Sequence, residues 1–404
     1  MNKYKKSQFN YYFEYKNESY VFNCLSGSII QLENKHFEIM QETEDVLLDN
    51  GFIVSNDKDE VQSMIDDIDS YVNTIRNELD ITIILTEMCN FKCVYCYQTK
   101  DVHVFSKEDA DKFIEQAKEL YDGGVERLNI HYFGGEPLLN FDVLKYLDVH
   151  MKQIANECSK TYKSYITTNG SLLTEMIIKN IGFETFYLTF DGNRYWQNKL
   201  KISPIDSYEN NIQLIKLILN ESNSNINVRL NVCEENKNSF YETINEIVSL
   251  DEYAKERVKF EISPLKKFKE EAMFTELSLE EYARVDFDLR LAIQKTGVTL
   301  YLPRALQEPC KYTTGNAYCI GPKMKCYYCT SDNSVIDKKS NLKENYFNKK
   351  YHHKLSERCK KCEVLPLCIH SCGLLKTKES ACVSEKIILK DILCEYLKNP
   401  DEWR

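Results

Sequence analysis

Apolar runs and helical stretches alternate regularly through the middle of the chain. Short runs rich in β-branched and aromatic residues predict strands at residues 81–88, 127–135, 164–170, 186–192, 227–232 and 258–265. Patterns of helical period lie between and after these runs, at residues 107–120, 142–157, 174–180, 207–219, 239–250 and 278–296. This alternation predicts an α/β fold in which helices cover a parallel sheet. Six such units fit either a partial barrel or a doubly wound sheet.

The first 80 residues have a different pattern. Short strands are expected at residues 10–16, 19–25 and 28–33, followed by a helical stretch at 35–51, a strand and turn at 52–60 and a long helix at 61–79. A module of this size is either a winged-helix-like α+β adaptor or an extension that packs on the next domain. Beyond Leu302 the periodicity fades and cysteines become frequent. We therefore predict domains at residues 1–78, 79–302 and 303–404.

Cysteine is the residue type that changes this picture. Of 16 cysteines in 404 residues, three cluster at Cys89, Cys93 and Cys96, and nine fall between Cys310 and Cys382. In a reducing compartment such clusters bind metal more often than they form disulfides. The four scattered ones are expected to be small buried apolar residues: Cys24, Cys158, Cys233 and Cys394.

Charge and hydropathy exclude some partners. A net charge of −10 argues against a surface that binds nucleic acid. No apolar run approaches the roughly 18 residues that a membrane crossing needs, so no membrane partner is expected. No apolar segment of a secretory signal follows the basic N-terminus, and we expect a cytoplasmic protein.

The first cysteine cluster follows the first strand predicted for the sheet. Its spacing, C-x3-C-x2-C, suits three corners of a four-iron cluster and leaves one iron without a protein ligand. A structural zinc site would need a fourth ligand, and the nearest histidines are His103 and His131. A zinc-stabilised binding protein is the non-enzymatic alternative.

This loop, with Tyr95 directly before the third cysteine, resembles the cluster loop of the radical S-adenosylmethionine superfamily. The resemblance implies a partial (β/α)6 barrel and S-adenosylmethionine bound at the open iron of a [4Fe–4S] cluster. It also implies cleavage to methionine and a 5′-deoxyadenosyl radical, which abstracts hydrogen from the substrate. Cys89, Cys93 and Cys96 are the implied catalytic ligands.

Further segments match this family at the carboxyl ends of the predicted strands. The matching residues are Gly134, Gly135, Glu136 and Pro137 (the GGEP motif), Thr167, Thr168 and Asn169 in the third-strand segment, and Asp191 and Asn231 at the ends of the fourth and fifth strands. Glycines let a backbone approach a ligand closely, and a glutamate offers an acceptor to the methionine ammonium. Asp191 is a candidate catalytic residue, with a helix cap as its alternative role.

The cysteines of the tail resemble the SPASM extension of these enzymes, which carries two auxiliary [4Fe–4S] clusters. By this resemblance the distal cluster is held by Cys359, Cys362, Cys368 and Cys382, and three corners of the nearer one by Cys310, Cys329 and Cys372. Its fourth corner is Cys319 or Cys326, or it stays open to substrate. The family has a glycine five residues before the second cysteine of the earlier pair, and Met324 stands at that place before Cys329.

Relatives with this arrangement mostly modify peptides or proteins. Because a small module precedes the barrel, the resemblance favours maturases of ribosomal peptides, of the ranthipeptide or sactipeptide type, in which a leader peptide adds a strand to a sheet edge. The expected reaction is an oxidative crosslink, a thioether first among the candidates. The implied partners are a precursor peptide with its leader and an electron donor such as flavodoxin or ferredoxin. Alternatives are a sulfatase maturase-like protein oxidase, a peptide epimerase and a carbon–carbon crosslinker.

Overall fold

The computed structural model describes residues 3–33, 43–98, 102–267, 270, 272–335, 341–369, 372 and 382–403. The chain divides into two compact units. Unit 1 consists of Met1–Thr74, Thr299–Thr314 and Lys350–Arg404, and unit 2 of Ile75–Val298 and Gly315–Lys349. This grouping differs from the predicted division into three consecutive segments at 78/79 and 302/303.

Unit 2 is built on a nine-stranded sheet with the order β13-β12-β10-β9-β8-β6-β14-β15-β16. Six strands are parallel and follow the chain from β6 outward to β13. They are β6 (Glu78–Thr86), β8 (Arg127–Gly134), β9 (Thr161–Thr167), β10 (Thr185–Phe190), β12 (Asn225–Val232) and β13 (Val258–Pro264). The predicted α/β fold with six strand–helix units, a partial (β/α)6 barrel, is confirmed.

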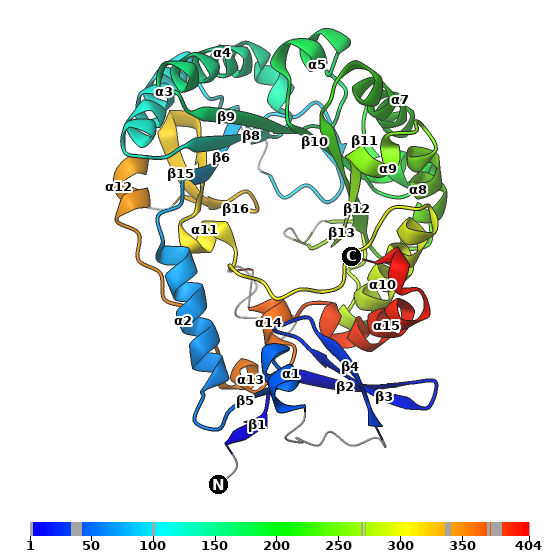
Figure 1. Cartoon of the computed structure of the whole chain (residues 1–404). Coiled ribbons are helices and arrows are strands. Elements are labelled where there is room, and N and C mark those ends of the chain that lie inside the picture. The colour runs from blue at the N-terminus through cyan, green and yellow to red at the C-terminus, as the bar shows by residue number, and fades with distance from the viewer. Residues whose placement is uncertain are drawn as a thin grey trace. The chain divides into compact units, whose positions relative to one another are not determined.

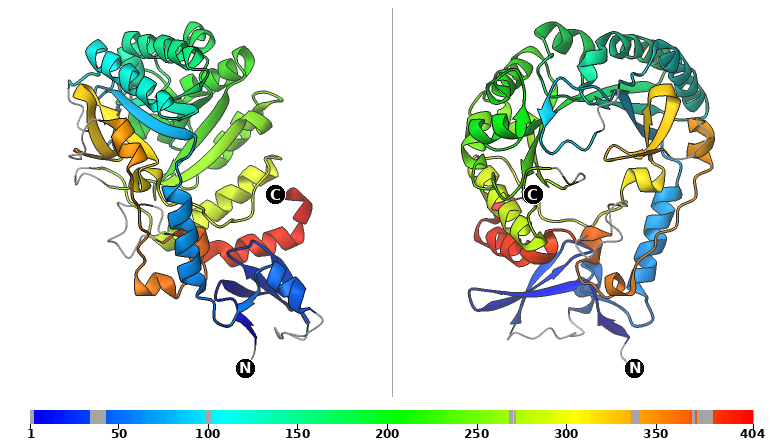
Figure 2. Two further views of the ribbon diagram at one scale, coloured as in Figure 1. Left: turned by 60° about the vertical axis from the view of Figure 1, so that its left-hand side comes forward. Right: turned by 180° about the vertical axis from the view of Figure 1, so that it is seen from behind.

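Helices cover one face of this curved sheet (Figures 1 and 2). The helices that follow the six parallel strands are α3 (Lys107–Asp122), α4 (Phe141–Glu157), α5 (Glu175–Ile181), α7 (Ser207–Glu221), α8 (Phe240–Val248) and α10 (Leu279–Lys295). Further helical elements of this unit are η2 (Pro137–Asn140), α6 (Arg194–Leu200), α9 (Ala254–Arg257) and α12 (Leu342–Phe347). Side chains alternate along β8: Leu128 and Ile130 are fully buried, whereas Asn129 and His131 are less buried and lie on the other face.

The cysteine-rich region adds strands to this sheet that the sequence pattern did not predict. β14 (Ala317–Gly321) pairs in parallel with β6, with Cys319 opposite Thr82. After the turn η3 (Pro322–Met324), β15 (Lys325–Cys329) and β16 (Asp332–Val335) continue the sheet in antiparallel pairs. The pairing of β14 with β6 explains why this region groups with the barrel.

Unit 1 contains two small antiparallel sheets and several helices. Its strands are β1 (Tyr4–Lys6) paired with β5 (Ile53–Ser55), and β2 (Asn10–Tyr15), β3 (Glu18–Asn23) and β4 (Ile29–Leu32) in order. Its helices are α1 (Glu44–Asp49), α2 (Glu60–Asn73), α11 (Lys311–Thr314), α13 (Glu357–Lys360), α14 (Leu365–Cys368), α15 (Glu385–Lys398) and η4 (Pro400–Glu402).

Two predicted helices of this unit have different bounds in the structure. The helix expected over 61–79 ends at Asn73, because Thr74 has an extended backbone and Glu78 already begins β6. Of the helical stretch expected over 35–51, the structure shows α1, and residues 35–42 lie outside the described residues.

One apolar core joins the first and last segments of unit 1. Phe9 and Phe22 of the N-terminal segment and Ile68 of α2 pack in the same cluster as Leu365 and Leu389 from the C-terminal helices. Each such side chain contributes about 1.5–3 kcal/mol when it is fully removed from water. This shared burial explains why the two ends of the chain form one unit.

None of the helices in the described part of the chain combines the length and the apolar character that a membrane crossing needs.

Candidate functional site

The cluster loop leaves the carboxyl end of β6, which is where a parallel α/β sheet places its chemistry. Cys89 lies three residues after the last residue of the strand, and Cys93 ends the short strand β7 (Lys92–Cys93). β7 pairs with β11 (Lys201–Ile202), so that Cys93 lies opposite Lys201. The loop is thus held at its middle by a strand pair.

The three thiols of this loop lie close enough to affect one another electrostatically. Burial raises the pKa of Cys93 to about 12; the charge of Lys201 opposes this, and the charges of Asp191, Cys96 and Cys89 add to it. Cys89 Sγ accepts hydrogen bonds from Phe91 N at 3.4 Å and from Asn169 Nδ2 at 3.8 Å.

This set of donors fits an iron–sulfur cluster. Within the described residues, no three Cys, His, Asp or Glu side chains converge closely enough to hold a single metal ion. The thiolates of a four-iron cluster bind separate irons, so they surround the cluster and do not meet at one point. Three soft sulfur ligands on one loop match that requirement.

The two glycines of the GGEP motif allow the end of β8 to pack against the cluster loop. A Cβ on Gly134, whose φ is +153°, would lie 2.3 Å from Thr86 O, and one on Gly135 would lie 2.2 Å from Met88 O. Gly135 N and Glu136 N donate hydrogen bonds of 2.8 Å to these same two carbonyls. These glycines therefore let β8 pack against the cluster loop, and their predicted close approach to a ligand stays a prediction.

Glu136 joins the segments that follow β8 and β9. Its fully buried carboxylate accepts hydrogen bonds from Thr168 Oγ1 (2.7 Å), Asn169 N (2.8 Å) and Leu138 N (3.1 Å). Burial raises its pKa to about 7, against the opposite effect of these three bonds. Thr167 is directed elsewhere and forms a 2.7 Å hydrogen bond with His131 Nε2.

This raised pKa predicts a pH-dependent stability. The ordinary pKa of 4.5 rises to about 7 on folding, so the contribution of Glu136 is fully present below pH 4.5 and is lost as the pH rises through 7. The free energy of unfolding of the cluster-free protein is expected to fall by on the order of 3 kcal/mol between these limits because of this group. In Glu136→Gln that part of the fall should disappear, as measured by denaturant unfolding at pH 5, 6, 7 and 8. The exposed Glu119→Gln is the matched control, and an unchanged pH profile in Glu136→Gln would refute the assignment.

Asp191 is the centre of a second buried network. Its Oδ2 accepts a 2.7 Å hydrogen bond from the Tyr95 hydroxyl, and its Oδ1 accepts one of 3.1 Å from Asn231 Nδ2. Burial raises the pKa of Asp191 and that of Tyr95. The helix-cap alternative for Asp191 is wrong, because Asn193 caps α6. The network joins the cluster loop to the ends of β10 and β12.

Three residues of this network were not predicted. Lys201 is buried, donates to Thr189 O at 2.6 Å, and lowers the pKa of both Cys93 and Asp191 by its charge. Asn236 Nδ2 donates 2.9 Å hydrogen bonds to the carbonyl oxygens of Asp191 and Asn231. Gln197 Oε1 accepts from Asp191 N at 2.7 Å. The sequence gives no sign of these residues, because none of them belongs to a motif with a recognisable spacing. Their contacts with the site form only when the chain folds.

Three cysteines of the tail lie together in unit 2. Cys319, Cys326 and Cys329 are buried on β14 and β15. Burial raises the pKa of Cys319, and the charges of Cys329 and Cys326 raise it further. Gly321 stands five residues before Cys326, and a Cβ there would lie 2.5 Å from the Tyr327 ring. The glycine expected before the second cysteine is therefore present if that cysteine is Cys326, not Cys329.

The remaining tail cysteines belong to unit 1. Cys359 and Cys362 lie on one turn, with Cys362 N donating to Cys359 O at 3.0 Å, and Ser356 Oγ contacts Cys359 Sγ at 3.2 Å. Burial raises the pKa of Cys24, and the charges of Glu363 and Cys362 raise it further, so Cys24 neighbours this segment. The others are Cys310 next to α11, Cys368 at the end of α14, the exposed Cys372, and Cys382, whose Sγ accepts from Lys386 Nζ at 3.8 Å.

Residues 83–247 match the sequence profile of the Radical SAM superfamily, and these residues form a radical SAM domain. Among curated proteins, the chain is 27% identical over 234 residues to the radical SAM cyclopropyl synthase TigE of Paramaledivibacter caminithermalis, covering 52% of this chain and 45% of that protein. It is 30% identical over 184 residues to the GTP 3′,8-cyclase of Helicobacter pylori, covering 44% of this chain and 52% of that protein. The chain thus spans about half the length of the curated relatives it matches.

Two solved structures share the fold over most of the chain. Streptococcus suis SuiB bound to precursor peptide SuiA has a TM-score of 0.55 at 15% identity, covering 94% of this chain and 98% of that one. Native anSMEcpe with bound AdoMet and Cp18Cys peptide has a TM-score of 0.56 at 17% identity, covering 80% and 97%. At such identities the likeness establishes the fold alone.

Proposed function

We propose that this chain, in which residues 83–247 form a radical SAM domain, is a maturase that installs an oxidative crosslink in a ribosomal precursor peptide. The observation that carries the proposal is the joining of the three-thiol loop to the GGEP segment and to Asp191 at the ends of the parallel strands. The fold shared with SuiB, whose structure holds a precursor peptide, supports a peptide substrate.

In this proposal Cys89, Cys93 and Cys96 would hold a [4Fe–4S] cluster, and S-adenosylmethionine would bind at the iron that no cysteine ligates. A cluster bound there supplies the electron that cleaves S-adenosylmethionine to methionine and a 5′-deoxyadenosyl radical. Glu136 fixes the segment of Thr168 and Asn169 against the cofactor site through its hydrogen bonds. The hydroxyl of Tyr95, a residue of the loop, donates a hydrogen bond to the fully buried Asp191 and so ties the loop to the end of β10.

The cysteines of the tail are proposed to hold auxiliary clusters. Cys319, Cys326 and Cys329 offer thiolates within unit 2, and the position of Gly321 favours Cys326 as the ligand that follows the family's glycine. Cys359, Cys362, Cys368 and Cys382 are the proposed ligands of the distal cluster. The roles of Cys310 and Cys372 in the nearer cluster stay predictions.

The proposed reaction is thioether formation between a peptide cysteine and a carbon of another residue. One hydrogen atom leaves the carbon for the deoxyadenosyl group, and the thiol loses its proton as the carbon–sulfur bond forms. Auxiliary clusters held by the tail cysteines would accept the one electron that this oxidation releases. The S-adenosylmethionine cleavage itself takes an electron from a flavodoxin- or ferredoxin-type donor in the cytoplasm.

The test uses the reconstituted enzyme and the precursor peptide encoded beside its gene, followed by mass spectrometry. Thioether formation removes two hydrogen atoms from the peptide and protects one cysteine from alkylation by iodoacetamide. A mass loss with the cysteine still alkylated would indicate a carbon–carbon crosslink, and inversion of one residue without mass change would indicate an epimerase. An unmodified peptide with turnover of S-adenosylmethionine would contradict the maturase proposal.

A further inference from the structure

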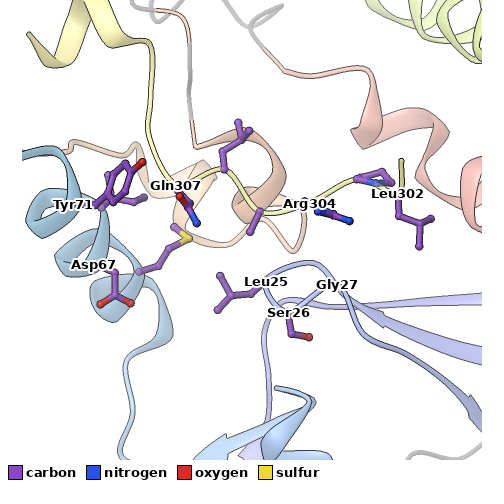
Figure 3. Close-up of a pocket in the computed structure, with 13 residues that line it drawn as sticks. Leu25, Ser26, Gly27, Asp67, Tyr71, Leu302, Arg304 and Gln307 are labelled. Carbon is purple, nitrogen blue, oxygen red and sulfur yellow. The ribbon is translucent and has the colours of Figure 1, made fainter. Parts of the chain in front are cut away.

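A cavity of about 690 Å³ lies within unit 1, and its walls come from three segments distant in sequence (Figure 3). These are the turn after β3 at Leu25–Gly27, the α2 helix, and the irregular segment 302–307. The volume is within the usual range of roughly 300–1,000 Å³ for ligand sites.

The wall of this cavity is largely apolar. Met64, Ile68 and Tyr71 follow one face of α2 at positions i, i+4 and i+7. Leu25, Tyr71 and Leu306, one from each wall segment, keep 41%, 38% and 40% of their surface exposed. Exposed apolar side chains that converge from separate segments mark an interaction site.

Two charged side chains, Asp67 and Arg304, flank the apolar wall. Figure 3 shows Asp67 beside Tyr71 on α2 and Arg304 near Leu302 on the other side. In the part of the chain that the structure describes, neither has a hydrogen-bond or salt-bridge partner; Arg304 only lies 5.8 Å from the ring centre of Tyr301. An occupant that carries a positive and a negative group on an apolar body would complement both.

The backbone of the segment 302–307 can also form hydrogen bonds with an occupant of the cavity. Over the described residues, the first four of its residues form no backbone hydrogen bond, and Leu306 N donates to Pro366 O at 2.9 Å. Because Pro303 has no N–H, the free donors are those of Leu302, Arg304 and Ala305. Backbone groups of this kind pair well with an extended peptide.

We infer that this cavity binds a segment of the precursor peptide. The peptide backbone lies along residues 302–305 and places aliphatic side chains against Leu25, Met64 and Ile68. A basic side chain lies at Asp67 and an acidic one at Arg304. The inference rests on the proposed function and adds a recognition site to it, separate from the strand addition expected at a sheet edge.

The experiment measures fluorescence anisotropy of labelled 12-residue peptides that tile the precursor encoded beside the gene, with the full-length reconstituted protein. We expect at least one tile with aliphatic residues between a basic and an acidic residue to bind. Asp67→Lys and Leu306→Asp should each weaken its binding at least fivefold. Replacing the basic residue of that tile by glutamate should restore its binding to Asp67→Lys and weaken its binding to the wild type.

The matched control is Met176→Asp on α5, whose native side chain is 63% exposed and lies outside the cavity; it should bind the tile as the wild type does. The comparison includes only variants whose iron content and melting temperature equal those of the wild type. The inference would be overturned if no tile bound, or if both cavity variants bound the tile as the wild type does. It would also be overturned if the tile with the reversed charge did not bind to Asp67→Lys. Failure of the proposed function is distinguishable, since it shows as absent S-adenosylmethionine cleavage or an unmodified peptide in the wild type.

Discussion

Replacing Cys93 by alanine is expected to reduce the formation of 5′-deoxyadenosine from S-adenosylmethionine to the background of the cluster-free protein. Cys93 is held by the β7–β11 pair, opposite Lys201 and within electrostatic reach of Cys89 and Cys96. Loss of one of three thiolates leaves two irons of the proposed cluster without protein ligands, so the cluster should not persist. The measurement is chromatographic quantification of 5′-deoxyadenosine after anaerobic reconstitution and reduction with dithionite.

Iron content separates loss of this cluster from general misfolding. The wild type should hold about 12 iron atoms, and the triple alanine variant of Cys89, Cys93 and Cys96 about 8, if both auxiliary clusters form. Cys158→Ala, at the end of α4, is the matched control and should behave as the wild type in both assays. Wild-type turnover in Cys93→Ala would refute the assignment of the loop.

Gly135→Ala is expected to have nearly as large an effect, although it removes no ligand. The added Cβ would lie 2.2 Å from Met88 O, which is backbone and cannot swing away. The end of β8 must then separate from the cluster loop, and the hydrogen bond from Glu136 N to Met88 O is strained or lost. Overpacking of this kind costs about 1–3 kcal/mol of stability. S-adenosylmethionine binding, measured by equilibrium dialysis, and its cleavage should both be lost.

Gly124→Ala is a suitable comparison for this variant. Gly124 has a positive φ, +106°, and nothing lies within 4 Å of its added Cβ. It should lose some stability from backbone strain and keep its activity. If Gly135→Ala bound and cleaved S-adenosylmethionine as well as Gly124→Ala does, the packing account of the GGEP motif would fail.

The parts of the site that lie in contiguous motifs were predictable from the sequence. The spacing of Cys89, Cys93 and Cys96 and the position of the GGEP segment after a strand are local features. The six strand–helix units were predictable for the same reason, since hydrophobic periodicity is also local. The hydrogen bonds of the Glu136 carboxylate to Thr168, Asn169 and Leu138 were not predicted. Its predicted contact with the methionine ammonium stays a prediction.

The parts that depend on distant contacts were not predictable. Lys201 becomes a neighbour of Cys93 only through the pairing of β7 with β11, two strands of two residues each. β14 joins the sheet by pairing with the edge of β6 that β8 leaves unpaired. Its five residues are too few to show a clear hydrophobic periodicity in the sequence. The shared core of Phe9 with Leu389 likewise brings together residues from the two ends of the chain.

Transfer of deuterium from the peptide to the cofactor tests the central claim most directly. The reconstituted enzyme is incubated with S-adenosylmethionine, a reductant and the precursor peptide encoded beside the gene, deuterated on its carbon atoms. A radical SAM peptide maturase should yield 5′-deoxyadenosine that carries one deuterium, in proportion to modified peptide. Absence of 5′-deoxyadenosine would contradict the radical chemistry, and 5′-deoxyadenosine without deuterium would contradict the peptide as the source of the abstracted hydrogen.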